Sequence, residues 1–328
     1  MAVLVTGGAG YIGSHTVAAL LEKGERVVVL DNLVQGHRRA VIGGTFCQGD
    51  LLDEAFLDRV FAEHDIEGVV HFAASSLVGE SMRDPGKYYR NNVGGTLNLL
   101  EAMRRAGVDR LVFSSTAAVY GEPERVPIRE EDRTEPANVY GETKLAMEKM
   151  IRWYGAIHGI RYMSLRYFNA AGAHDSGRIG EDHRPETHLI PLVLQVALGK
   201  RERINVFGDD YPTEDGTCIR DYIHVSDLAD AHVLALERLR RGGESGVYNL
   251  GAGKGYSVYE VIAAAREVTG HPIPAAVRPR RPGDPAALVA SPDKAMAELG
   301  WAPKRSDLRR MIASAWEWHR RHPDGYGE

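Results

Sequence analysis

A tyrosine and a lysine four residues apart, Tyr140 and Lys144, are the side chains of this sequence best placed to move a proton. They stand in the segment NVYGETKLAMEKM, and on a helix this spacing puts both side chains on one face. A lysine ammonium beside a phenol favours the phenolate, so that a group with a pKa of ~10 becomes a base near neutral pH. The pair therefore predicts a base that takes a proton from a hydroxyl group.

A second motif is the glycine-rich start of the chain, VLVTGGAGYIGSH, in which Gly7, Gly10 and Gly13 are spaced three apart. Glycines let the backbone approach a pyrophosphate at the N-terminus of a helix. Asp31 follows Gly13 by 18 residues, where a dinucleotide-binding fold places the carboxylate that accepts the ribose hydroxyls. Because an acid there repels a 2′-phosphate, we expect the cofactor to be NAD rather than NADP.

Alternating strands and helices must position these residues. The sequence predicts strands at 2–6, 26–31, 68–74, 110–116 and 161–169, and helices at 11–22, 53–64, 87–105 and 140–158. This alternation predicts an α/β fold of the Rossmann type, with a doubly wound parallel sheet whose ligands bind outside the carboxyl ends of the strands. Thr116 and Asn169 each end a strand, so we expect both to face the cofactor.

The pattern changes after Asn169, where a long loop rich in glycine, proline and charge begins. Such a loop in a compact domain is usually functional. Strand and helix patterns then return, and residues 247–251 resemble one more sheet strand. We expect an NAD-binding Rossmann domain at 1–168 with a returning segment at about 221–252, and a smaller, mixed α/β substrate-binding domain at 169–220 and 253–328.

Composition and charge argue against several classes of function. A chain of 328 residues with 44% hydrophobic and 26% charged residues is typical of a globular protein, and its net charge of −5 predicts neither a nucleic-acid nor a membrane partner. Two cysteines and the lack of a signal-like or transmembrane run favour the cytoplasm. His183, Glu186 and His188 match no standard zinc spacing, so we expect no metal.

Longer segments carry a family resemblance. They include TGGAGYIGSH, HFAA, FSSTAAVYGEP, YGETK, LRYFNAAGA, ETHLIP, YNLGAG and RPGDPA, and they cover nearly the whole chain. The most specific is FGDDYPTEDGTCIRDYIHVSDLADAH at 207–232. In these segments the sequence resembles the extended short-chain dehydrogenase/reductases and, within them, the UDP-glucose 4-epimerase family.

The resemblance implies an isomerase that inverts C4 of a UDP-hexose, interconverts UDP-glucose and UDP-galactose in galactose metabolism, and keeps NAD tightly bound. Tyr140 would be the base and later the acid, while Lys144 would bind the nicotinamide ribose and lower the pKa of the tyrosine. Thr116 would hydrogen-bond the sugar O4. Hydride would pass from C4 to NAD, the 4-keto sugar would turn over while its UDP is held, and hydride would return to the other face.

The same resemblance implies the binding residues and a homodimer. The cofactor residues would be Gly7, Gly10, Tyr11, Ile12, Gly13, Asp31, Asn32, Asp50, Leu51, Phe72, Ala73, Ala74, Ser76, Asn91, Ser114, Tyr140, Lys144 and Tyr167. The substrate residues would be Thr116, Tyr140, Asn169, His188, Leu189, Phe207, Arg220, Arg281, Asp284 and Leu288. The dimer would form through two helices whose apolar residues are Val93, Leu97, Leu100, Met103, Met147 and Ile151.

Other functions on the same fold remain open. UDP-N-acetylglucosamine 4-epimerase, alone or as a dual activity, depends on Leu288, which is intermediate between the large residues that exclude N-acetyl groups and the small ones that admit them. A 4,6-dehydratase needs an acid–base pair where Ala117 and Ala118 follow Thr116. An NADPH reductase would carry a basic residue in place of Asp31, and a protein that only senses NAD or a nucleotide sugar would lose Tyr140 or Lys144.

Overall fold

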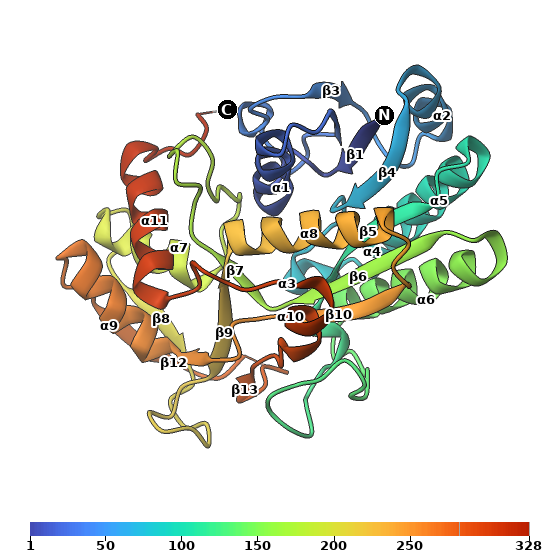
Figure 1. Ribbon diagram of the computed structural model, residues 1–328. Helices are drawn as coiled ribbons and strands as arrows, with labels where there is room; N and C mark the ends of the chain where they lie inside the picture. The colour runs from blue at the N-terminus through green and yellow to red at the C-terminus, as the bar shows by residue number, and fades with distance from the viewer. Residues whose placement is uncertain (282, 328) are drawn as a thin grey trace.

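A seven-stranded sheet forms the centre of the computed structural model, which describes residues 1–281 and 283–327 (Figure 1). Its strand order is β10-β6-β5-β4-β1-β2-β3, and every neighbouring pair is parallel. The order reverses between β1 and β4, so the predicted doubly wound Rossmann-type fold is confirmed. The strands are β1 (Ala2–Thr6), β2 (Val27–Asp31), β3 (Thr45–Gln48), β4 (Ile66–His71), β5 (Arg110–Thr116), β6 (Arg161–Tyr167) and β10 (Gly246–Leu250).

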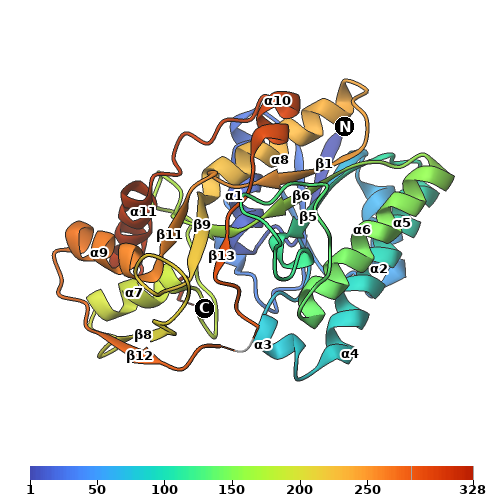
Figure 2. The same cartoon turned by 90° about the horizontal axis from the view of Figure 1, so that it is seen from below.

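Helices cover both faces of this sheet, as Figure 2 shows. One face carries α1 (Tyr11–Glu22), α8 (Val225–Arg240) and α10 (Asp293–Leu299), and the other carries α2 (Glu54–Glu63), α5 (Gly95–Ala106) and α6 (Val139–His158). Along β1, Val3 and Val5 therefore enter the first core, whereas Ala2 and Leu4 enter the second. Burial on both faces explains why the strand is continuously apolar rather than alternating.

A second, smaller group of elements follows β6. β7 (Asn169–Ala171), β9 (Ile219–His224), β11 (Gly255–Ser257) and β13 (Ala287–Leu288) form one sheet, and β8 (Ile204–Phe207) pairs with β12 (Ala275–Arg278). They pack with α7 (Leu189–Ala197), α9 (Val258–Thr269) and α11 (Leu308–Arg321). The strand predicted at 161–169 thus divides, because the chain leaves the large sheet at Tyr167 and enters the smaller sheet at Asn169.

The segment that returns to the large sheet consists of α8 and β10. β9, which precedes α8, belongs to the smaller sheet, and the chain crosses between the sheets again after β10. The C-terminal segment packs near α1 and the turn before β3, where Tyr326 joins Ala18 and Ala40 in one buried cluster and Arg39 Nη1 donates to the Tyr326 carbonyl at 2.7 Å. Among the helices of the described chain, none is long and apolar enough to cross a membrane.

The apolar faces of α5 and α6 differ in part from the dimer surface expected from the sequence. Leu100, Met103, Met147 and Ile151 are fully buried in the core between these helices and the sheet. Their helical spacing reports the packing of one chain, so their assignment to a dimer contact was wrong. Leu97 alone of the six is strongly exposed, at 42%.

A buried ion pair fastens α6 to the sheet. Glu148 Oε2 lies 2.6 Å from Arg166 Nη2, and the two side chains are only 8% and 7% exposed. The Ser115 hydroxyl donates to the same carboxylate, and Arg166 Nη1 donates to the Tyr120 hydroxyl at 2.9 Å. Because Glu148 stands one helical turn after Lys144, this pair fixes the part of α6 that carries the predicted lysine.

Replacing Glu148 by alanine should lower the free energy of unfolding by about 3–5 kcal/mol, because it leaves the Arg166 charge buried without its partner. Urea unfolding followed by circular dichroism measures this loss. Glu317→Ala removes an exposed carboxylate from α11 and should leave the midpoint nearly unchanged. Equal midpoints for Glu148→Ala and the unchanged protein would show that the pair does not stabilise the fold.

Candidate functional site

The predicted cofactor residues gather at the carboxyl ends of the large sheet's strands. The β1–α1 loop and the start of α1 carry Gly7, Gly10, Tyr11, Ile12 and Gly13; Asp31 and Asn32 stand at the end of β2, Asp50 and Leu51 follow β3, and Phe72, Ala73, Ala74 and Ser76 follow β4. Asn91 lies before α5, Ser114 on β5, Tyr140 and Lys144 on α6, and Tyr167 ends β6.

The glycine loop packs so closely that side chains do not fit. Gly7 has a φ of +71°, and a Cβ on it would lie 2.6 Å from the Ala73 amide nitrogen. A Cβ on Gly13 would lie 2.2 Å from the Gly7 carbonyl oxygen. α1 begins after Gly10 without a side-chain cap, which leaves backbone N–H groups of its first turn for an anion. The loop is therefore shaped to approach a pyrophosphate.

The acidic residues near the loop lie together. Asp31 accepts hydrogen bonds from the amides of Ala9 at 3.0 Å and Leu33 at 2.8 Å, which hold its carboxylate beside the loop. Burial raises the pKa of Asp31, while these amides act in the opposite direction. Asn32 Nδ2 donates to Asp50 Oδ2 at 2.8 Å. The residues predicted to hold the adenosine half of the cofactor thus share one edge of the sheet.

Tyr140 and Lys144 lie on one face of α6, as their spacing predicts. Lys144 Nζ donates to the Ser114 carbonyl at 2.8 Å and lies 6.0 Å from the centre of the Tyr140 ring. The hydroxyls of Ser114 and Tyr167 are hydrogen-bonded to each other. The ends of β5, β6 and α6 therefore meet around the proposed base.

The pKa values of the pair differ from the sequence expectation. Burial raises the pKa of Tyr140 to about 12, against a hydrogen bond with Thr116 that lowers it. Burial also lowers the pKa of Lys144 to about 7, although the Glu148 carboxylate favours the ammonium. The expected lowering of the tyrosine pKa by the lysine is not found, because burial disfavours both the phenolate and the ammonium.

Thr116 occupies the end of β5. Its Oγ1 accepts a hydrogen bond from the Ala118 amide at 3.1 Å. The Thr116 side chain also lies near enough to the Tyr140 phenol to lower its pKa, so this hydroxyl both caps the backbone turn and lies beside the proposed base. Ala117 and Ala118 begin this turn, where no carboxylate could serve an elimination.

A π-helical turn at Tyr89–Gly94 interrupts the helix predicted at 87–105. Inside it, the buried Asn92 accepts the Ser75 amide at 2.7 Å and donates to Thr143 Oγ1 at 3.1 Å. Asn91 Nδ2 donates to Ser75 Oγ at 3.0 Å. Asn92, which the sequence reasoning did not select for the site, therefore ties the segment containing Ser76 to the helix of Tyr140.

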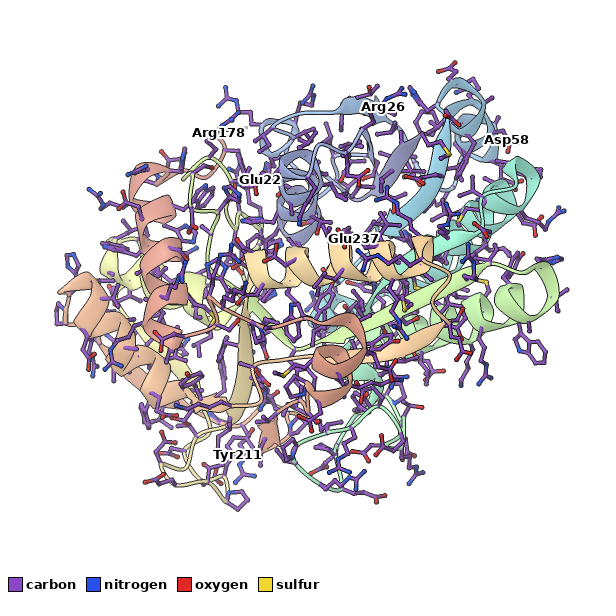
Figure 3. The ribbon with its side chains drawn as sticks, viewed as in Figure 1. Glu22, Arg26, Asp58, Arg178, Tyr211 and Glu237 are labelled. Atoms are coloured by element: carbon purple, nitrogen blue, oxygen red, sulfur yellow. The ribbon has the colours of Figure 1, made fainter. Side chains whose placement is uncertain are left out.

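The predicted substrate residues other than Thr116 and Tyr140 come from the smaller group of elements. Asn169 begins β7, His188 and Leu189 stand at the start of α7, Phe207 ends β8, Arg220 lies on β9, Leu288 on β13, and Arg281 and Asp284 between β12 and β13. Arg220 Nη2 lies 2.8 Å from Asp284 Oδ1, and the Arg281 guanidinium lies 4.0 Å from the Phe207 ring centre. Tyr211, which Figure 3 labels, lies in the loop after β8 and makes a similar contact with the guanidinium of Arg280, which follows β12.

Leu288 connects these residues to the large sheet. It pairs with Arg220 in the parallel β13–β9 register and packs against a cluster that includes Val119, Leu145 and Phe168. Leu288, on which the admission of N-acetyl groups is predicted to depend, and Arg220 are therefore neighbours in a single sheet.

Asp221 was missed by the sequence reasoning. Its buried carboxylate accepts the amides of Ala252 at 2.8 Å, Ala290 at 3.1 Å and Gly253 at 3.2 Å. Burial raises its pKa to about 6, although these amides favour the charged form. An acid inside the apolar segment RDYIHV was the available signal, since a buried carboxylate needs partners. Asp221 fixes the two segments that flank β9.

His188 takes part in a cluster that the sequence did not predict. Its Nδ1 and the Nδ1 of His183 both face the carboxylates of Glu181 and Glu186. Burial opposes charge on the histidines, but the carboxylates outweigh it and raise the pKa of His183 to about 9 and that of His188 to about 10. The structure thus brings together the three residues considered for a metal and adds Glu181 to them.

The glycine loop, the buried Tyr140 and Lys144, and the arginines of the smaller group form the candidate site. Residues 3–251 match the family described as NAD dependent epimerase/dehydratase, and the chain belongs to this family.

Similar proteins within this family are UDP-glucose 4-epimerases. The UDP-glucose 4-epimerase of Halalkalibacterium halodurans is 62% identical over 326 residues, covering 99% of this chain and 98% of the relative. A crystal structure of a UDP-glucose 4-epimerase, 59% identical, covers 100% of both chains with a TM-score of 0.98. The enzyme from Bifidobacterium longum in complex with NAD⁺ and UDP is 44% identical with a TM-score of 0.93, covering 99% of this chain and 100% of its own.

Replacing Tyr140 by phenylalanine should lower kcat for a UDP-hexose by ~10²–10⁴-fold, because it removes the group that exchanges the proton. Steady-state assays of the purified variant measure the loss. Tyr154→Phe, on the same helix, removes a hydroxyl that donates to Glu101 at 2.6 Å, and it serves as the control with kcat preserved. Near-normal turnover by Tyr140→Phe would exclude the phenol as the base.

Proposed function

We propose that this protein interconverts UDP-glucose and UDP-galactose by inverting C4 of the hexose, with NAD as its bound cofactor. The observation that carries the proposal is the meeting of Thr116, Tyr140 and Lys144 at the carboxyl end of β5, which lies next to β4 in the large sheet. Leu288 of β13 packs against the cluster that includes Leu145 of α6, so the smaller group of elements reaches this place. Near-complete coverage by UDP-glucose 4-epimerases at up to 62% identity supports this substrate over the alternatives.

NAD fits the residues at the glycine loop. A Cβ at Gly7 or Gly13 would collide with the backbone and force apart the loop that leads to the uncapped N-terminus of α1, where a pyrophosphate would bind. Asp31 suits ribose hydroxyls rather than a 2′-phosphate. Lys144 would hold the nicotinamide ribose, with Ser114 and Tyr167 beside it. When bound, the cofactor would supply an acceptor for the hydride of C4 and a donor for its return to the opposite face of the sugar.

Tyr140 takes the proton from the 4-hydroxyl and later gives it back, while Thr116 hydrogen-bonds O4 and relays the proton. A phenol with a pKa of about 12 requires additional positive charge nearby to act at neutral pH. The Lys144 ammonium and an oxidised nicotinamide ring would supply it. Without carboxylates at positions 117 and 118, no group there removes water, and the proton returns to O4.

The UDP half of the substrate would be held by the smaller group of elements. Arg220 and Arg281 offer planar guanidinium groups to the diphosphate, Phe207 lies by the uracil, and Asp284 binds its ribose. Asn169, His188 and Leu189 line the diphosphate side. In this proposal, residues 1–168 and about 221–252 bind NAD, and residues 169–220 and 253–328 bind the UDP-sugar.

We also propose a homodimer formed by the outer faces of α5 and α6. Trp153 is 61% exposed, Ile157 is 67% exposed, and Leu97 is 42% exposed. Apolar side chains of this size on adjacent helices favour a self-complementary contact.

Purified protein should convert UDP-galactose without added NAD, because each turnover returns the hydride and regenerates the oxidised cofactor. Product formation is measured by chromatography, and the nicotinamide content by enzymatic assay after denaturation. UDP-N-acetylgalactosamine should react more slowly, because Leu288 limits the volume in which the sugar turns. Stoichiometric consumption of added NAD would contradict epimerisation and indicate a dehydrogenase.

Replacing Trp153 and Ile157 together by glutamate should convert the protein to a monomer, because charges would be buried in the contact. Sedimentation velocity at micromolar concentration measures the change in mass. Met296→Glu, at a residue 46% exposed on α10, is the control and should remain dimeric. A monomeric unchanged protein would contradict the proposed dimer.

A further inference from the structure

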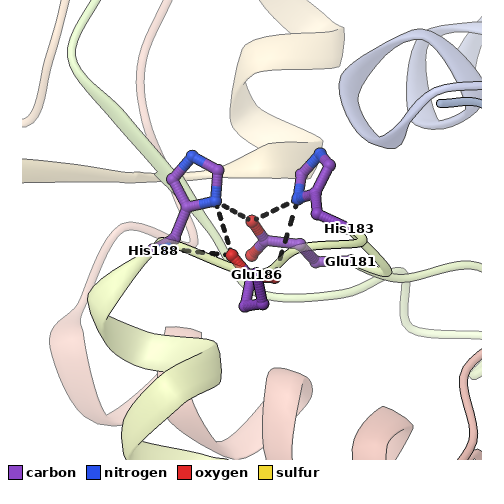
Figure 4. A group of neighbouring side chains, drawn as sticks. All are labelled: Glu181, His183, Glu186 and His188. Atoms are coloured by element: carbon purple, nitrogen blue, oxygen red, sulfur yellow. Dashed lines mark hydrogen bonds and ion pairs between the residues drawn. The ribbon is translucent and has the colours of Figure 1, made fainter. Parts of the chain in front are cut away.

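Four side chains of the loop between β7 and α7 converge on one point. The Nδ1 of His188 lies 2.9 Å from Glu181 Oε1 and 2.8 Å from Glu186 Oε1 (Figure 4). The Nδ1 of His183 lies 3.2 Å from Glu181 Oε1 and 3.6 Å from Glu186 Oε2. One ligand atom of each residue can be chosen so that all lie within 4.8 Å of one another. None of these contacts has a role in the chemistry proposed at Tyr140.

The spacing of these atoms suits a small cation. Bonds of about 2.0–2.2 Å to nitrogen and oxygen place the corners of a tetrahedral zinc site ~3.3–3.6 Å apart. The observed nitrogen–oxygen separations of 2.8–3.6 Å lie close to that range, so small side-chain rotations suffice. Metal binding would release a proton from each histidine; the two neutral imidazoles and two carboxylates then carry a charge of −2, which a divalent cation balances.

One ligand atom lacks the hydrogen bond expected of a buried polar group. The Nδ1 of His183 is buried and, among the described residues, makes no contact with hydrogen-bond geometry, although Glu181 is near. Here a ring nitrogen lies near a carboxylate without the geometry of a hydrogen bond. Two ligands of one metal ion lie side by side in this way. Glu181 is also deeply buried, with a side chain only 5% exposed.

The loop is fixed before any ion binds. Glu186 Oε1 accepts the amides of Thr187 at 2.7 Å and His188 at 2.8 Å, which orients the carboxylate. Asp182, between two of the four residues, accepts the Tyr326 amide at 3.0 Å and lies 3.4 Å from His37. A cavity of about 460 Å³, lined in part by Glu181, His183 and Glu186, offers a route for an ion.

We propose that Glu181, His183, Glu186 and His188 bind one zinc ion. Imidazole and carboxylate ligands in a tetrahedral set favour zinc over magnesium or calcium, which take oxygen ligands alone. The ligands follow one another at positions i, i+2, i+5 and i+7 of a loop, so they escape the motifs built from paired cysteines or helical histidines. The ion closes a short ring in the loop and fixes His188 at the start of α7.

This site would brace the loop at the junction of the two groups of elements. The His183 ring packs edge-on against Tyr11 of α1, with ring centres 6.1 Å apart, and Tyr11 donates to the Gly172 carbonyl at 2.6 Å. α1 carries the glycine loop, and α7 belongs to the smaller group. Zinc would therefore stabilise the contact between them without taking part in proton or hydride transfer.

The test measures metal content rather than activity, so it is independent of the proposed reaction. Untagged protein, purified without chelator and dialysed, should contain about one zinc ion per chain by mass spectrometry of elements. The chelator-treated protein should regain zinc on titration and show a higher Tm with zinc than without. Cobalt reconstitution should give the visible absorption bands of a four-coordinate N/O site.

Two variants and a control separate the outcomes. His183→Ala/His188→Ala should lose the zinc, and Glu186→Gln, which keeps the shape of the side chain, should bind it more weakly. His174→Ala alters a histidine of the same loop outside the cluster and should retain full zinc content. Circular dichroism checks that each variant folds. The proposal is overturned if neither the purified nor the reconstituted protein contains zinc. It is equally overturned if the double variant binds zinc as well as the unchanged protein does.

Discussion

The rest of the site depends on one close contact, that between Gly7 of the glycine loop and the backbone of Ala73 after β4. This contact leaves no room for a Cβ on the glycine. Gly7 reaches within van der Waals distance of Ala73 only because it has no side chain and adopts a positive φ. This approach brings the N-terminus of α1 to the place where the strand order reverses. The same close packing sets the positions of the glycine loop, of Asp31 after β2 and of the residues after β4.

Tyr140 and Lys144, the residues proposed for proton transfer, depend on a different constraint, the burial of α6. Lys144 is held against the carboxyl end of β5 because Glu148, one turn later, forms a buried ion pair with Arg166 of β6. The same burial disfavours charge on both Tyr140 and Lys144. The surroundings of Tyr140 thus have a low dielectric constant, in which an added positive charge has a large effect on the pKa of the phenol. The burial of α6 therefore both stabilises the fold and sets the pKa values of the two residues.

Local patterns in the sequence predicted much of this molecule. β1 and α1 begin and end where the apolar runs and glycines place them, and the spacing of Tyr140 and Lys144 predicted their common face. Features that depend on distant contacts were not predictable in this way. The π turn around Asn92, the burial of Leu100 and Met147, and the pKa values of the catalytic pair arise from packing between segments far apart in the chain. Glu181 joins its cluster through the folding of a loop that has no periodic pattern.

The chain's repeated crossing between the two sheets has a consequence for how the protein is made. β6 is hydrogen-bonded to β5 on one side and to β10 on the other, yet β10 is encoded nearly eighty residues after β6 ends. On the ribosome, which releases the N-terminal residues first, β6 remains an open sheet edge while β7, α7, β8 and β9 emerge. The nascent nucleotide-binding sheet therefore gains its last strand only after β7, α7, β8 and β9 have been synthesised, whereas β11, α9, β12, β13 and α11 of the smaller group follow β10. The synthesis of the two groups is interleaved, and neither can be completed before the other has begun.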